Sequence, residues 1–198
     1  MANILFLDNF DSFTYNLVDQ FRVLGHNVKI YRNDTNLEQV VQEALNTPDT
    51  ILALSPGPGT PAEAGILLPL IERLKNDVPI IGICLGHQLL SNAFGYETYK
   101  LKFGQHGSNH PVQNLQTNTV EITSQNHNYN VPESIAEIAT ITHRNLFDGT
   151  IEGVRYKDAP IFSVQYHPES SAGPHESEYL FKEFLEILSD KTQNQNVE

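Results

Sequence analysis

The chain has 198 residues, of which 39% are hydrophobic and 18% charged, a composition typical of a soluble globular protein with one α/β domain. Its 24 acidic and 12 basic side chains give a formal charge of −12, which argues against nucleic acid or an anionic membrane surface as a partner. A single cysteine excludes an internal disulfide framework and fits a reducing compartment. The N-terminus does not resemble a secretory signal, and no apolar run approaches the roughly 20 residues of a membrane span. We therefore expect a cytoplasmic protein.

The first half of the chain alternates between predicted strands and predicted helices. Strands are expected at residues 4–7, 28–31, 50–54 and 78–83, and helices at 13–24, 37–45, 66–74 and 88–94. The connections are too long for hairpins, so this alternation favours a parallel sheet with helices on both faces.

The character of the sequence changes after residue 95. Short strands with polar turns are expected at 96–103, 112–115, 119–123, 136–142 and 153–156, whereas 104–111 resembles a loop. A core strand at 161–165 and an amphipathic helix at 179–188 follow. The predicted fold class is α/β, with an open, mostly parallel sheet, flanking helices and an antiparallel β extension. We assign residues 1–189 to one domain and 190–198 to a polar tail.

The centre of the sequence is a strand that turns sharply into a helix. Gly82 and Gly86 lie two residues before and after Cys84, where a Cβ would collide with the bend. Such an elbow lifts one side chain to the N-terminus of a helix, where free N–H groups and the helix dipole stabilise a thiolate. A lone cysteine is more often a small buried hydrophobic residue. The flanking glycines favour a nucleophile here.

Three stretches follow predicted core strands, at residues 55–61, 84–88 and 166–170. Sites in parallel α/β sheets form beyond the carboxyl ends of the strands, so these stretches should converge. If the chain stays extended, Glu169 lies on the same side as His167 and can orient its imidazole toward Cys84. The backbone N–H groups of Gly59 and Leu85 would then form an oxyanion hole.

Two other interpretations of these residues are weaker. The segment Ser55–Gly59 lacks the Lys-Ser/Thr pair of a phosphate-binding loop. His106 and His110 are four residues apart, but no second ligand pair at metal-site spacing accompanies them. We therefore predict no metal and no cofactor.

Together these motifs resemble the class I (triad) glutamine amidotransferases, and the resemblance covers Asn3 to about Leu188. The motifs are Gly-Ile-Cys-Leu-Gly-His-Gln, a downstream His-Pro-Glu and an upstream Pro-Gly-Pro-Gly. The resemblance implies a glutaminase in which Cys84 attacks the side-chain amide of L-glutamine and forms a thioester. It further implies that His167 protonates the departing ammonia, that Glu169 holds the imidazole, and that ammonia passes to a large synthase subunit.

The two parts of the chain resemble different members of this class. Residues 1 to about 83 are similar to anthranilate synthase component II and its aminodeoxychorismate relative, on Asp-Asn-Phe-Asp-Ser-Phe-Thr-Tyr-Asn and Ser-Pro-Gly-Pro-Gly-Thr-Pro. Residues from about 89 on resemble the carbamoyl-phosphate synthetase small subunit, on Gln-His-Gly-Ser-Asn-His-Pro and Ser-Gln-Asn-His-Asn-Tyr. That subunit normally carries a separate N-terminal domain before this region. We interpret the chain as a hybrid, natural or constructed.

Carried over by position, the resemblance implies glutamine contacts at Gly57, Gly59, Leu85, Gln88, Asn126, Asn128 and Tyr129. Asn128 and Tyr129 depart from the Gly and Phe usual in carbamoyl-phosphate synthetases, and a larger side chain at 128 would narrow the pocket. A plain polar turn is the alternative for 126–129. We predict a chorismate-using synthase partner. The alternatives are the large subunit of carbamoyl-phosphate synthetase, a non-catalytic docking role, and a γ-glutamyl hydrolase without a partner.

Overall fold

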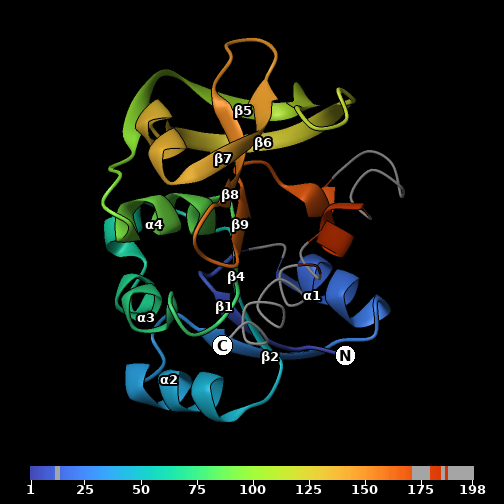
Figure 1. Ribbon diagram of the computed structural model, residues 1–198. Coiled ribbons are helices and arrows are strands. Elements are labelled where there is room, and N and C mark those ends of the chain that lie inside the picture. Colours follow the sequence, from blue (N-terminus) through green and yellow to red (C-terminus); the bar gives the residue numbers. More distant parts are fainter. Residues whose placement is uncertain (12–13, 171–178, 184–185, 187–198) are drawn as a thin grey trace.

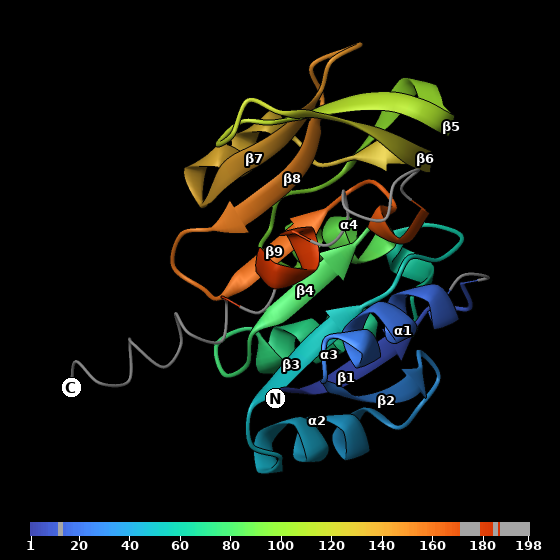
Figure 2. The same ribbon diagram turned by 90° about the vertical axis from the view of Figure 1, so that its right-hand side faces the viewer.

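The computed structural model describes residues 1–11, 14–170, 179–183 and 186. The predicted tail at 190–198 and the end of the predicted terminal helix lie outside the described residues. Within the described part, one sheet has nine strands in the order β2-β1-β3-β4-β9-β8-β7-β5-β6. β2, β1, β3, β4 and β9 run parallel, and the strands from β9 to β6 are antiparallel neighbours (Figures 1 and 2). The predicted α/β class with an antiparallel extension is confirmed.

The elements follow the predicted alternation closely in the parallel half. The strands there are β1 (Asn3–Asp8), β2 (Asn27–Arg32), β3 (Thr50–Leu54), β4 (Ile80–Ile83) and β9 (Ile161–Val164). The helices are α1 (Thr14–Val23), α2 (Leu37–Asn46), α3 (Leu67–Leu74) and α4 (Leu85–Ala93). Asn36 caps α2 by accepting a hydrogen bond from the N–H of Gln39 at 3.1 Å, as expected for an N-cap side chain. No helix of the described residues is long and apolar enough to cross a membrane.

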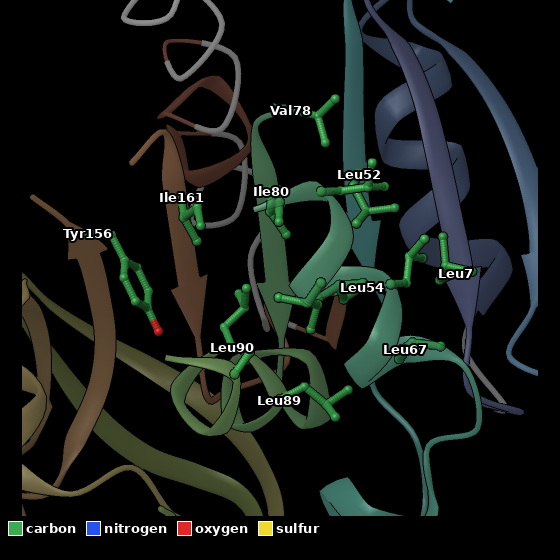
Figure 3. Packing of buried hydrophobic residues seen from close by; sticks show 14 of the residues in the cluster. Leu7, Leu52, Leu54, Leu67, Val78, Ile80, Leu89, Leu90, Tyr156 and Ile161 are labelled. Carbon is green, nitrogen blue, oxygen red and sulfur yellow. The ribbon is translucent and has the colours of Figure 1, made fainter. Parts of the chain in front are cut away.

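Two hydrophobic clusters hold the parallel part of the sheet between its helices. One joins Leu52, Leu54 and Ile80 to the apolar faces of α2, α3 and α4 (Figure 3). The other joins Ile51 and Ile81 to α1 and to the helical residues 179–183 on the opposite face. Successive strand residues therefore point to opposite faces, and both faces are buried.

The antiparallel extension contains β5 (Tyr99–Asn114), β6 (Val120–Asn130), β7 (Ala139–Asn145) and β8 (Ile151–Tyr156). The predicted loop at 104–111 is wrong, because this segment continues β5 and pairs with β6. Register shifts between Lys100 and Gln105 and between Gly107 and His110 let the polar, glycine-containing segment remain in the ladder. The alternative of a polar turn at 126–129 is also wrong, since these residues belong to β6.

Candidate active site

The bend between β4 and α4 has the strained geometry that its glycines predict. Cys84 is the N-cap of α4 and has φ 54° and ψ −103°, in a region that non-glycine residues rarely occupy. A Cβ on Gly86 would lie 2.6 Å from the carbonyl oxygen of Leu54, and one on Gly82 would lie 2.7 Å from Cδ1 of Leu90. Only glycine at both positions lets the chain turn this closely.

The elbow is fastened to the neighbouring strand and opens into a cleft. The N–H of Cys84 donates to the carbonyl of Val164 at 2.8 Å, so the bend continues the pairing of β4 with β9. Cys84 is only 5% exposed and contacts the cluster on the α1 face, yet it also lines the cleft. The thiol is therefore shielded from bulk water but faces the space where a substrate would lie.

A histidine and a carboxylate follow β9 and meet at the same cleft. Nδ1 of His167 lies 2.8 Å from Oε1 of Glu169, whose side chain is fully buried. The expectation of an extended chain is wrong here, because Pro168–Ser170 forms the short 3-10 helix η3. The pair nevertheless forms, and the N–H of His167 donates to the carbonyl of Ser124 at 3.1 Å, which holds this segment against β6.

The environment of His167 strongly favours its protonated form. Burial lowers the pKa of His167, but hydrogen bonds and charge interactions with Cys84 and Glu169 outweigh burial and raise it to about 11. The imidazole thus lies 2.8 Å from the carboxylate and interacts electrostatically with the sulfur. Such an arrangement can support an imidazolium beside a thiolate, which is the reactive form of a Cys–His nucleophile.

The cleft itself has a volume of about 690 Å³ and collects the residues predicted for substrate binding. Cys84 and His167 line it together with every predicted contact: Gly57, Gly59, Leu85, Gln88, Asn126, Asn128 and Tyr129. A Cβ on Gly57 would lie 2.4 Å from Cβ of Asn9, so the loop after β3 packs directly against the end of β1. The roles of the seven predicted contacts in substrate binding stay predictions, as does the oxyanion hole at Gly59 and Leu85.

One exposed histidine braces two of the predicted contacts. Nδ1 of His106 lies 2.9 Å from Oδ1 of Asn126, and Nε2 lies 3.0 Å from Oδ1 of Asn128. His106 belongs to β5 and the two asparagines to β6, so the imidazole bridges the strands beside the cleft. In the part of the chain that the structure describes, no three His, Cys, Asp or Glu side chains gather as a metal site.

The structure also brings to the cleft region residues that sequence reasoning did not single out. Gln165 is fully buried, and its Nε2 lies 3.5 Å from Sγ of Cys84. Phe10 and His127 line the cleft as well. A signal for Gln165 was available, since a polar residue directly follows the apolar run of β9 and lies two positions before His167. No local pattern marks Phe10 or His127 as a cleft residue.

Comparison with known proteins assigns the family. The family model for the class-I glutamine amidotransferases matches residues 5–187. The chain belongs to this family.

Relatives within the class-I glutamine amidotransferases fall into two named groups. The chain is 57% identical to the carbamoyl phosphate synthase small chain of Helicobacter pylori over 176 residues, which are 88% of this chain and 47% of that protein. It is 56% identical to anthranilate synthase component 2 of Haemophilus influenzae over 179 residues, which are 86% of this chain and 90% of that protein. The chain thus spans about half the length of the carbamoyl phosphate synthase small chains it matches. Similarity to both groups is consistent with a hybrid.

Solved structures share the architecture of the chain. A protein described as a GMP synthase subunit from Thermoplasma acidophilum has a TM-score of 0.81 at 24% identity, covering 99% of this chain and 98% of its own. A glutamine amidotransferase from Thermotoga maritima has a TM-score of 0.67 at 19% identity, covering 100% of this chain and 86% of its own. At these identities the similarity supports the fold.

Proposed function

We propose that this class-I glutamine amidotransferase is a glutaminase whose catalytic residues are Cys84, His167 and Glu169. The observation that carries the proposal is that His167, held by the buried carboxylate of Glu169 at 2.8 Å, lines the same cleft as Cys84. The site contains the three groups that thiol-based catalysis requires, namely a nucleophile, a base and a group that orients the base.

The reaction follows from these roles. Sγ of Cys84 attacks the side-chain carbonyl carbon of L-glutamine, and the negative charge that develops on the oxygen is stabilised by the N–H groups of Gly59 and Leu85. As N1 of α4, Leu85 has an N–H without an intrahelical partner. The C–N bond breaks as His167 transfers a proton to the nitrogen, which leaves as ammonia. Water then attacks the thioester while His167 accepts a proton, and glutamate leaves with the thiol restored.

The ammonia would pass to a large synthase protein, and we propose a chorismate-using partner. The segment that resembles anthranilate synthase component II forms one rim of the cleft, where Phe10 is 51% exposed and stacks near the guanidinium of Arg32 at 5.4 Å. Tyr15 in the same segment is 71% exposed. An exposed aromatic side chain at the cleft, with a second one further along the same segment, suits a protein partner.

A carbamoyl phosphate synthase large chain is the second candidate partner. The opposite wall of the cleft, from β6, carries Asn126 and Tyr129, in the part that resembles the small chains of that enzyme. Both candidate partners would draw ammonia from the same cleft.

Ammonia release from L-glutamine by the purified chain tests the glutaminase. We expect release by the wild-type chain and none by Cys84→Ser, while a solvent-exposed control such as Lys102→Ala keeps wild-type activity. Absence of release by the wild-type chain, alone and with both large partners, would contradict the proposal.

Co-purification with each large partner tests the choice between them. Retention of the anthranilate synthase large component, together with stimulation of ammonia release by it, supports our choice. Binding to the carbamoyl phosphate synthase large chain alone overturns it.

A further inference from the structure

A buried amide lies against the sulfur of Cys84. Gln165 is 0% exposed, and its Nε2 donates to Sγ of Cys84 at 3.5 Å. We propose that Gln165 is a further catalytic residue, a neutral hydrogen-bond donor that stabilises the Cys84 thiolate alongside His167. This inference rests on the proposed glutaminase function and adds to it a residue outside the Cys–His–Glu set.

The orientation of the Gln165 amide follows from its neighbours. The carbonyl of Tyr129 can only accept, so the group that Gln88 presents to it at 3.1 Å must be the amide Nε2. The same Nε2 lies 3.1 Å from Gln165, which must therefore present its oxygen. The NH₂ group of Gln165 is then left to face the sulfur. One backbone carbonyl thus fixes the direction of two side-chain amides.

The carbonyl that sets this direction is itself held in place. Nδ1 of His127 donates to the carbonyl oxygen of Tyr129 at 2.9 Å, and its Nε2 lies 2.8 Å from Oε1 of Gln125. Gln88, Gln165 and His127 are each less than 7% exposed. A hydrogen bond aimed at a negative sulfur is stronger in such surroundings than in water, because little solvent screens it.

The proposed donor complements the imidazole in a specific way. His167 gives up its donating proton when it protonates the leaving nitrogen, whereas an amide keeps its N–H groups at every working pH. Gln165 therefore remains a hydrogen-bond donor at the sulfur in the step in which His167 is neutral. Two donors on one sulfur stabilise its negative charge, and the thiolate is the form that attacks the substrate.

The test is the pH dependence of alkylation by iodoacetamide in the full chain. Cys84 is the only cysteine, so the reaction reports this thiol alone. In Gln165→Met, which keeps the length of the side chain but has no donor, we expect the midpoint of the alkylation profile to rise by about one to two pH units. The value of kcat should fall roughly 10- to 100-fold, with little change in the KM for glutamine.

Two further variants make the result interpretable. Gln165→Glu retains the size of the side chain and places a carboxyl beside the sulfur, so its midpoint should rise at least as far; it carries the test if Gln165→Met does not fold. Ser163→Ala is the matched control, because Ser163 is buried on the same strand and contacts His87 rather than the sulfur. Its alkylation midpoint should equal that of the wild type.

An unchanged midpoint in folded Gln165→Met or Gln165→Glu would overturn the proposal and reduce Gln165 to a packing residue. Failure of the glutaminase is a separate result, since it appears as absent ammonia release by the wild-type chain. The alkylation profile needs no turnover, so it tests the donor even in that case.

Discussion

His167 and Glu169 meet side chain to side chain at 2.8 Å even though the chain turns into a 3-10 helix between them. The carboxylate is buried at 0% exposure, so its charge acts on the imidazole with little screening by water. The contact raises the pKa of His167, as does the contact with Cys84. The carboxylate thus controls both the direction of the ring and its protonation.

Glu169→Gln should therefore slow turnover and change its pH dependence. The amide keeps the shape of the side chain but removes the negative charge, so we expect kcat to fall roughly 10²- to 10⁴-fold. The pKa of His167 should fall as well, which moves the alkaline limb of the kcat/KM profile to lower pH. Ammonia release measured from pH 6 to 11 checks both effects. Glu97→Gln, at an exposed carboxylate, is the control. An alkaline limb that stays in place would contradict the assigned role of Glu169.

Gly86→Ala should damage the elbow. The added Cβ would lie 2.6 Å from the backbone oxygen of Leu54, and backbone cannot move aside as a flexible side chain can. We expect a loss of about 1–3 kcal/mol in the free energy of unfolding, measured by urea denaturation, together with a large loss of activity. Gly149→Ala is the comparison, because no atom lies within 4 Å of its Cβ and only its φ of 74° is strained. Equal effects of the two changes would show that the elbow tolerates a side chain.

Glu152→Gln should change how stability depends on pH. Burial raises the pKa of Glu152 to about 8, against a usual value near 4.5 in the unfolded chain. Between these values the folded state holds a proton that the unfolded state has released, so this residue lowers stability as pH rises from 4.5 to 8. The amide cannot ionise, so the Tm of the variant relative to wild type should increase across that range. Thermal unfolding at pH 5, 6.5 and 8 measures it.

The matched control for that series is Asp158→Asn, at an exposed carboxylate. Its Tm difference from wild type should stay nearly constant with pH. The prediction fails if the Tm difference between Glu152→Gln and the wild type is also constant with pH. Burial would then not destabilise the charged form of Glu152.

His106→Ala should weaken the binding of glutamine rather than its turnover. His106 bonds to both Asn126 and Asn128, which line the cleft. Losing one or two such hydrogen bonds should raise the KM for glutamine roughly 3- to 10-fold and leave kcat at saturation within about twofold. Lys102→Ala, on the same strand and exposed, should leave KM unchanged. An unaltered KM in His106→Ala would contradict the prediction that His106 positions Asn126 and Asn128 for glutamine binding.

The sequence was sufficient for the parallel half and for the position of the elbow. Buried β-branched runs and amphipathic helices can be recognised within a short stretch of sequence. The two glycines around Cys84 likewise indicate a sharp bend, because a side chain at either position would collide there. Local patterns failed for β5, where Gly104 and Gly107 indicate a loop but the strand continues. Its pairing depends on β6, a partner that a local pattern does not show.

The candidate site divides in the same way. Cys84, His167 and Glu169 lie in short motifs at predicted strand ends, so they could be named before any coordinates. The position of Gln165 after a core strand was visible, but its role was not, because that role depends on an amide orientation set by a carbonyl in β6. These hydrogen bonds join side chains and a carbonyl from three different segments, so no single segment of the sequence indicates them.

β4 and β9 are neighbours in the sheet, although β5 to β8 lie between them in the chain. Cys84 is therefore synthesised well before His167 and Glu169, the residues that would activate its thiol. While the intervening strands are being translated, the nascent polypeptide carries a cysteine that still lacks His167. Under the proposed glutaminase function, glutamine hydrolysis at this site must await the emergence of β9, and a chain that ends before that point releases no ammonia.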